Sequence, residues 1–249
     1  MSTSPDTLGA RPGLSNVVDI VVSPPTAFDR LRVVPTWGWA FLIATLLGVI
    51  GSLIVAPAIG HAMETSLPAQ LAANAQIAKL PPDQQASMIA MQLKFAKIIG
   101  QVYFIFVPIG ILVVGLVQGL IMLIANAAAR GDGSFKKLFA LSVTISVVGI
   151  GLNSIVLAVI VMVRGANSFE TTTAITSSLP SLALLAPGAH GALAGFLGAM
   201  NVFNLWATGL LALGMARVAR IPGGAAWGTA IVMLLVAASF AAFGAARNG

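Results

Sequence analysis

Five long apolar stretches, with no charged side chain in their interiors, constrain this chain more than any other feature. The hydrocarbon core of a bilayer is about 30 Å thick, and a helix crosses it with about 20 apolar residues. Backbone N–H and C=O groups in hydrocarbon must be paired internally, so each continuous stretch is expected to be a helix. The sequence therefore predicts an all-α integral membrane protein, a bundle of five transmembrane helices over about 36–60, 98–128, 139–163, 201–219 and 224–245.

The composition excludes a water-soluble domain and most catalytic sites. Only 8% of the 249 residues are charged and 58% are hydrophobic, whereas an average soluble domain has about 25% charged residues. Cysteine is absent, and His61 and His190 have no carboxylate at ligand spacing, so we expect no metal site and no cofactor. No HExxH, GxSxG or Walker phosphate-loop pattern is present, and we therefore expect no enzyme.

The positive charges indicate membrane anchoring and an orientation. The net charge is +6, but the 13 Lys and Arg residues are scattered at the edges of the apolar stretches, which does not favour a nucleic-acid partner. With a cytoplasmic N-terminus, eight of the 13 fall in inner segments and the two short loops are both inside. We expect a multi-pass protein of the cytoplasmic membrane, with its N-terminus inside and its C-terminus outside.

The N-terminal region is expected to contain a disordered tail and a short interfacial helix. Residues 1–14 are rich in Ser, Thr, Pro and Gly, which is typical of disorder. Ser23-Pro24-Pro25 then reads as a helix start. This helix would lie on the cytoplasmic leaflet and lead to Trp37 and Trp39 at headgroup depth. Its apolar face consists of Ala27, Phe28 and Leu31.

Two longer segments are expected outside the membrane. Residues 62–97 contain helix formers divided by Pro81-Pro82, which predicts either a helical hairpin or the start of a long second helix. Residues 164–200 are Ser/Thr-rich and then apolar, with several prolines and glycines. We interpret 178–200 as a membrane-surface or re-entrant segment rather than a sixth span.

Three segments carry a resemblance to a known family. They are VVDIVVSPPTAFDRLRVVPTWGWAFLI before the first span, GDGSFKKLFALSVTISVVG at a glycine-rich turn, and MNVFNLWATGLLALGMARVARIPGGAAWGTAIV with its FxLW element. In these places and in its five-span layout the chain resembles the bacterial branch of the Yip domain family (Ypt-interacting proteins). The resemblance covers residues 15–245, which would form a Yip-like membrane domain after the cytoplasmic tail 1–14.

The resemblance implies a role without catalysis. Eukaryotic members of the family are linked to membrane trafficking and to small GTPases of the Rab type, and the family carries no established catalytic residues. The resemblance implies a scaffold or adaptor in membrane organisation, with the lipid bilayer and a membrane or cytoplasmic protein as partners. Partner contact is expected through the basic residues Arg30, Arg32, Lys136, Lys137, Arg217 and Arg220.

Polar side chains within the spans leave a second hypothesis open. No ionisable residue lies inside a span, which disfavours proton relays and ion-coupled transport. Gln118, Asn153 and Asn204 would either form hydrogen bonds between helices, worth about 0.6 kcal/mol on average, or line a polar substrate path. The structural role is favoured. The path would make the chain a permease or a lipid-handling protein.

Glycines and prolines mark packing and turns. The pairs Gly115/Gly119, Gly191/Gly195 and Gly224/Gly228 place small residues on one helix face. Packing within the chain is favoured over homo-oligomer formation. We also expect a kink at Pro108, a turn at Gly131-Asp132-Gly133 and an N-cap at Ser134.

Overall fold

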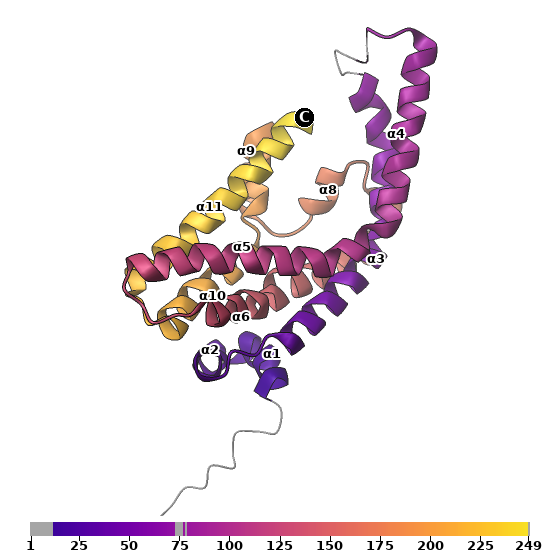
Figure 1. The fold of residues 1–249 in the computed structure, drawn as a ribbon. Helices are drawn as coiled ribbons and strands as arrows, with labels where there is room; N and C mark the ends of the chain where they lie inside the picture. The colour runs from indigo at the N-terminus through magenta and orange to yellow at the C-terminus, as the bar shows by residue number, and fades with distance from the viewer. Residues whose placement is uncertain (1–11, 73–76, 78, 249) are drawn as a thin grey trace, which may run out of the picture. The chain divides into compact units, whose positions relative to one another are not determined.

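The computed structural model describes residues 12–72, 77 and 79–248, and every regular element among them is helical. The prediction of an all-α protein is confirmed for this part of the chain. An isolated antiparallel bridge joins Ser181 to Asn201. The elements, drawn in Figure 1, are α1 (Pro12–Val22), α2 (Pro24–Val33), α3 (Gly38–Ala72), α4 (Pro82–Val102), η2 (Tyr103–Ile105), α5 (Phe106–Ala128), α6 (Phe135–Ser146), η3 (Val147–Leu152), α7 (Asn153–Arg164), η4 (Ala166–Ser168), α8 (Thr172–Thr176), η5 (Leu182–Leu185), α9 (Gly191–Ala199), α10 (Val202–Val218) and α11 (Gly223–Asn248).

Four helical segments of the described chain are long and apolar enough to cross a bilayer. They are Gly38–Ala72, Tyr103–Ala128, Phe135–Arg164 and Gly223–Ala246. The fifth predicted span corresponds to α10, an apolar helix of 17 residues that lies at the lower end of spanning lengths. Four spans are thus supported by length and composition, and the count of five is not confirmed.

The long segment after the first span is helical on both sides of its proline pair. Helix α3 continues to Ala72, and α4 begins at Pro82 with Asp83 in its first turn. Helix α4 then leads through the 3-10 turn η2 into α5, as in the alternative of a long second helix. The second span is interrupted at η2 and not at Pro108, where the sequence predicts a kink. Pro108 lies in the first turn of α5, where its missing N–H removes no helical hydrogen bond.

The chain forms two compact units, of which the first contains the residues up to Leu47, Pro108–Asn153 and Phe203–Ala237. Helices α1 and α2 contact each other and α6 in this unit (Figure 1). Ala27, Phe28 and Leu31 are fully buried there. The apolar face of α2, predicted to enter the lipid surface, is therefore covered by protein. The sequence identified this face correctly but not the surface that covers it.

The third span contains an irregular turn. Residues Val147–Leu152 form a π-helical turn between α6 and α7. Such turns are rare and insert into α-helices mostly as single turns, often at functional positions. Gly151 in this turn lies against α3, where an added Cβ would contact the Leu47 side chain at 3.1 Å.

The second unit contains Gly48–Val107, Ser154–Val202 and the end of the chain from Ala238. Its core joins the later turns of α3 to α7 and to the segment around α8. Helices α3 and α7 approach so closely that a Cβ on Gly51 would stand 2.7 Å from the Ser154 carbonyl oxygen. No helix between Gly165 and Asn201, a range described throughout, exceeds the nine residues of α9. The buried core residues are Val55, Ala58, Ala62, Ala158, Val161, Phe169 and Ile175.

Candidate functional site

One buried side chain closes the turn between α5 and α6. The Nδ2 group of Asn126 donates to the Gly133 carbonyl oxygen at 3.0 Å, and its Oδ1 accepts from the Gly133 N–H at 3.0 Å. The Asn126 carbonyl oxygen also accepts from the Gly131 N–H at 2.8 Å. Asn126 is only 5% exposed, so these bonds are shielded from water. Three hydrogen bonds to one residue therefore hold the turn in place.

The glycines of this turn are required by close approach. A Cβ on Gly131 would collide with the Asn126 Oδ1 atom and the Ile221 side chain, and would lie 2.6 Å from the Ala219 carbonyl oxygen. A Cβ on Gly133 would lie 2.7 Å from the Ala219 Cβ. The turn predicted at Gly131-Asp132-Gly133 is present. Its glycines make room for a second turn rather than only bending the chain.

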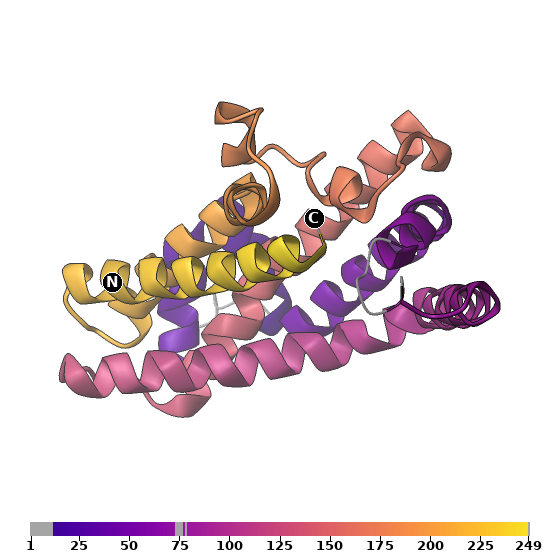
Figure 2. The same cartoon turned by 90° about the horizontal axis from the view of Figure 1, so that it is seen from above.

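That second turn joins α10 to α11. The Asp132 N–H donates to the Ala219 carbonyl oxygen at 3.0 Å, and Arg220 lies 3.5 Å from the Asp132 carboxylate. Arg130 and Arg220 follow the ends of α5 and α10 with left-handed backbones, at φ 54° and 53°. Figure 2 shows both turns at the same end of these helices. We call residues 129–134 and 219–222 together the double turn.

The six basic residues predicted to contact a partner divide into two groups. Arg30 pairs with Asp19 at 2.5 Å, Arg217 with Asp29 at 3.1 Å, and Arg220 with Asp132 at 3.5 Å. These pairs join α1 to α2, α2 to α10, and the two halves of the double turn. The remaining three form no ion pair with any residue that the structure describes, and they are Arg32, Lys136 and Lys137.

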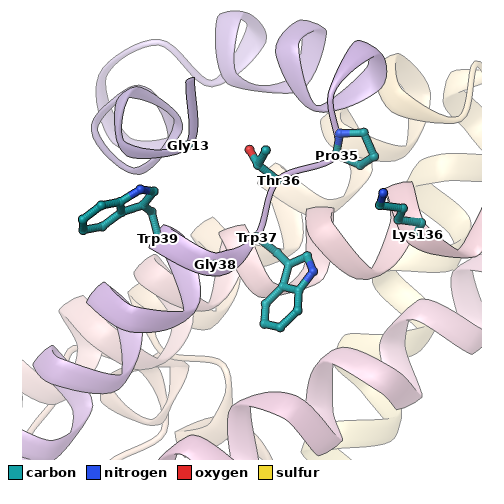
Figure 3. A pocket seen from close by; sticks show the side chains of 7 residues that line it. All are labelled: Gly13, Pro35, Thr36, Trp37, Gly38, Trp39 and Lys136. Carbon is teal, nitrogen blue, oxygen red and sulfur yellow. The ribbon is translucent and has the colours of Figure 1, made fainter. Parts of the chain in front are cut away.

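A pocket of about 530 Å³ lies where the chain enters α3 (Figure 3). Trp37 is held from one side by edge-on contacts with Phe41 and Phe139, at centroid distances of 6.0 and 5.4 Å. Trp39 packs on Gly13, whose Cβ position lies 2.9 Å from the indole Cδ1. The sequence predicted the two tryptophans at an interface but offered no signal for the pocket. Its lining residues are Gly13, Pro35, Thr36, Trp37, Gly38, Trp39 and Lys136.

The predicted intramembrane polar residues have different environments. The Gln118 Oε1 atom accepts a hydrogen bond of 2.5 Å from the Ser142 hydroxyl, which joins α5 to α6. The Asn153 Oδ1 atom is buried without a hydrogen-bond partner in the described structure, immediately after the π-helical turn. At Asn204, the backbone carbonyl accepts a bond of 2.7 Å from the Thr208 hydroxyl within α10.

The glycine pairs also differ from one another. Gly115 and Gly119 face α6, where their Cβ positions lie 3.1 Å from the Phe139 ring and 3.2 Å from the Phe135 ring. Gly195 packs against α11, close to the Ala241 backbone. Gly224 and Gly228 have no atom within 4 Å of their Cβ positions.

Two residues of this region have roles that differ from what the sequence predicts. Asn126 is not among the residues predicted from the sequence, although an amide in the last helical turn before a glycine-rich turn is a signal for such a closure. Ser134 precedes α6 as predicted, but its side chain forms no capping hydrogen bond. The Leu138 N–H instead donates to the Ser134 backbone carbonyl at 3.1 Å.

Comparisons with known proteins agree on the family. The family model for the Yip1 domain matches residues 18–245. The chain is also 24% identical over 230 residues to "Membrane protein YknW" of Bacillus subtilis (strain 168), which covers 92% of this chain and 89% of the Bacillus protein. No solved structure matches the chain significantly.

Proposed function

The chain belongs to the Yip1 domain family of membrane proteins, and we propose that it acts as a non-catalytic scaffold or adaptor in the bacterial cytoplasmic membrane. Its role would be to hold a membrane or cytoplasmic protein at the end of the bundle where the double turn lies. In this proposal that end faces the cytoplasm, because eight of the 13 Lys and Arg residues lie in segments that the sequence predicts to be inside.

The proposal rests on the difference between the basic residues that form ion pairs and those that do not. Arg30, Arg217 and Arg220 are occupied in ion pairs that link elements of the first unit. Arg32 and Lys137 lie on α2 and α6, which contact each other, and neither has a carboxylate partner among the described residues. Unpaired cations on a fixed surface favour an acidic partner surface.

The double turn supplies the rigidity that a docking surface needs. Asn126 fixes the turn before α6, and the Asp132 N–H ties it to the turn after α10. A surface that is ordered before binding loses less conformational entropy when a partner arrives. Lys137 on α6 therefore extends from a prearranged backbone.

Crosslinking in native membranes tests the proposal. The variant Arg32→Gln/Lys137→Gln removes two unpaired charges, and Lys79→Gln/Lys94→Gln removes two exposed lysines of the second unit. We expect the first variant to lose partner capture several-fold and the second to retain it. Recovery of no partner from wild-type membranes, or equal capture by both variants, would overturn the scaffold role.

A permease or lipid-handling function is the second candidate, and the unpaired Asn153 favours it. Its amide oxygen is buried beside a π-helical turn without a hydrogen-bond partner in the described structure, and the Thr45 hydroxyl is also buried and unpaired. Unpaired polar atoms inside a span are costly and are retained where they contact a ligand or water. Under this hypothesis, Asn153→Leu would abolish transport while leaving abundance in the membrane unchanged.

A further inference from the structure

We propose that the pocket beside Lys136 binds the headgroup of an anionic glycerophospholipid. This inference goes beyond the scaffold role, because it concerns a lipid site and a residue outside the proposed protein contact of Arg32 and Lys137. The lysine ammonium would contact the lipid phosphate, and the two indoles would pack against the glycerol region.

The charged groups near the pocket favour an anionic ligand. The carboxylates described in the first unit are Asp19, Asp29 and Asp132, and each is paired with an arginine. Lys136 is exposed and has no ion-pair partner among the described residues. No carboxylate among the described residues lines the pocket. The described part of the chain therefore supplies no anion to Lys136, and a bound anionic ligand would neutralise it.

The walls of the pocket favour a lipid over a small soluble anion. Trp37 and Trp39 both line the pocket, although their rings point in different directions from the start of α3, and Thr36 adds a hydroxyl (Figure 3). Tryptophan is enriched at headgroup depth because its ring combines an apolar body with one N–H donor. The pocket is an open depression on the surface, and its volume of about 530 Å³ exceeds what a free phosphate needs.

An apolar stripe leads away from the pocket along α3. Trp39, Leu42 and Leu46 are spaced three and four residues apart, which places them on one helix face. Their exposed fractions are 42%, 44% and 47%. Acyl chains attached to a headgroup in the pocket can lie along this stripe, whereas a soluble anion would leave it uncovered. The stripe thus favours a membrane lipid over a soluble anion as the occupant.

Native mass spectrometry of the purified full-length protein in detergent tests the site. Phosphatidylglycerol and phosphatidylcholine with the same acyl chains are added separately, and the fraction of lipid-bound protein is compared. One cation near a membrane phosphate corresponds to about a fivefold preference for the anionic lipid. We expect Lys136→Gln to lose this preference, and Lys137→Gln to keep it, because Lys137 does not line the pocket.

Two further measurements separate the lipid from other anions and from misfolding. Inorganic phosphate at the same concentration should not displace phosphatidylglycerol, because it cannot use the indole walls or the stripe. The thermal unfolding midpoint of Lys136→Gln should match that of the wild type, because the side chain forms no described ion pair. Retained preference in Lys136→Gln, or displacement by phosphate, would refute the site. Neither result bears on protein capture, which is tested with Arg32 and Lys137.

Discussion

The side-chain amide of Asn126 pairs with both backbone groups of Gly133, and each donor–acceptor distance is 3.0 Å. One side chain thereby satisfies a backbone donor and a backbone acceptor of a turn that connects two membrane-embedded helices. The pairing is buried, so no water replaces it when the amide is removed. This arrangement makes Asn126 the residue that holds the first half of the double turn.

Replacement of Asn126 should destabilise the protein strongly. In Asn126→Leu the Gly133 N–H and carbonyl lose their described side-chain partner in a buried position, which corresponds to about 2–4 kcal/mol. We expect the midpoint of thermal unfolding in detergent, followed by circular dichroism, to fall by several degrees. Asn126→Asp places a carboxylate oxygen against the Gly133 carbonyl oxygen in a buried position and should destabilise the protein at least as much as Asn126→Leu. A midpoint unchanged in Asn126→Leu would show that the pairing is dispensable.

A methyl group at Gly131 should separate the two turns. Its Cβ would collide with Asn126 and Ile221 and stand 2.6 Å from the Ala219 carbonyl oxygen, which is backbone and cannot rotate away. We expect Gly131→Ala to lose about 1–3 kcal/mol of stability. The matched control is Gly228→Ala, whose Cβ meets no atom within 4 Å. Equal melting behaviour of the two variants would contradict the close approach of the turns.

Features determined by local chemistry were predictable from the sequence. The apolar stretches located the spanning helices, and the proline pairs located the starts of α2 at Pro24 and α4 at Pro82. Helix α10 shows the limit of this reasoning. Its boundaries were predicted within one residue, but a 17-residue apolar helix is close to the shortest length that crosses a bilayer. Composition alone therefore cannot decide whether it spans.

Features determined by contacts between distant segments were not predictable. The pairing of Arg217 with Asp29 joins residues 188 positions apart, and no local pattern indicates it. The apolar face of α2 has the same spacing whether lipid or protein covers it. The pocket similarly requires Gly13 and Lys136 to meet at the start of α3. Such pairings depend on how helices pack, which spacing within one helix does not specify.

The hydrogen bond between Ser142 and Gln118 should contribute a small, measurable coupling. Its length is 2.5 Å, and it joins α5 to α6 at a partly buried position. Interhelical hydrogen bonds of this type contribute about 0.6 kcal/mol on average in membrane proteins. A double-mutant cycle with Gln118→Leu and Ser142→Ala should give a coupling free energy of that order. Strictly additive effects on the free energy of unfolding would indicate that the two side chains do not interact.

Arg30 and Arg32 should respond differently to loss of charge, although both lie in the last turn of α2. Arg30→Gln breaks a partly buried ion pair with Asp19 and should cost about 1 kcal/mol, since it weakens the contact of α1 with α2. Arg32→Gln should leave stability unchanged, because Arg32 forms no ion pair with a described residue. Thermal unfolding of both variants measures the difference. The reverse order of stabilities would contradict the division of the basic residues.

Asn153 provides the test that separates a structural role from a path through the membrane. Its Oδ1 atom is buried and has no hydrogen-bond partner in the described structure, so Asn153→Leu removes an unpaired polar atom without breaking a described side-chain bond. We expect the midpoint of thermal unfolding to stay the same or to rise, by an amount equivalent to about 1 kcal/mol, whereas Gln118→Leu should lower it. A clear loss of stability in Asn153→Leu would show that the amide forms a stabilising hydrogen bond in the folded protein. An unchanged or higher stability, combined with loss of a cellular activity, would instead show that the unpaired amide serves a ligand and would favour the permease over the scaffold.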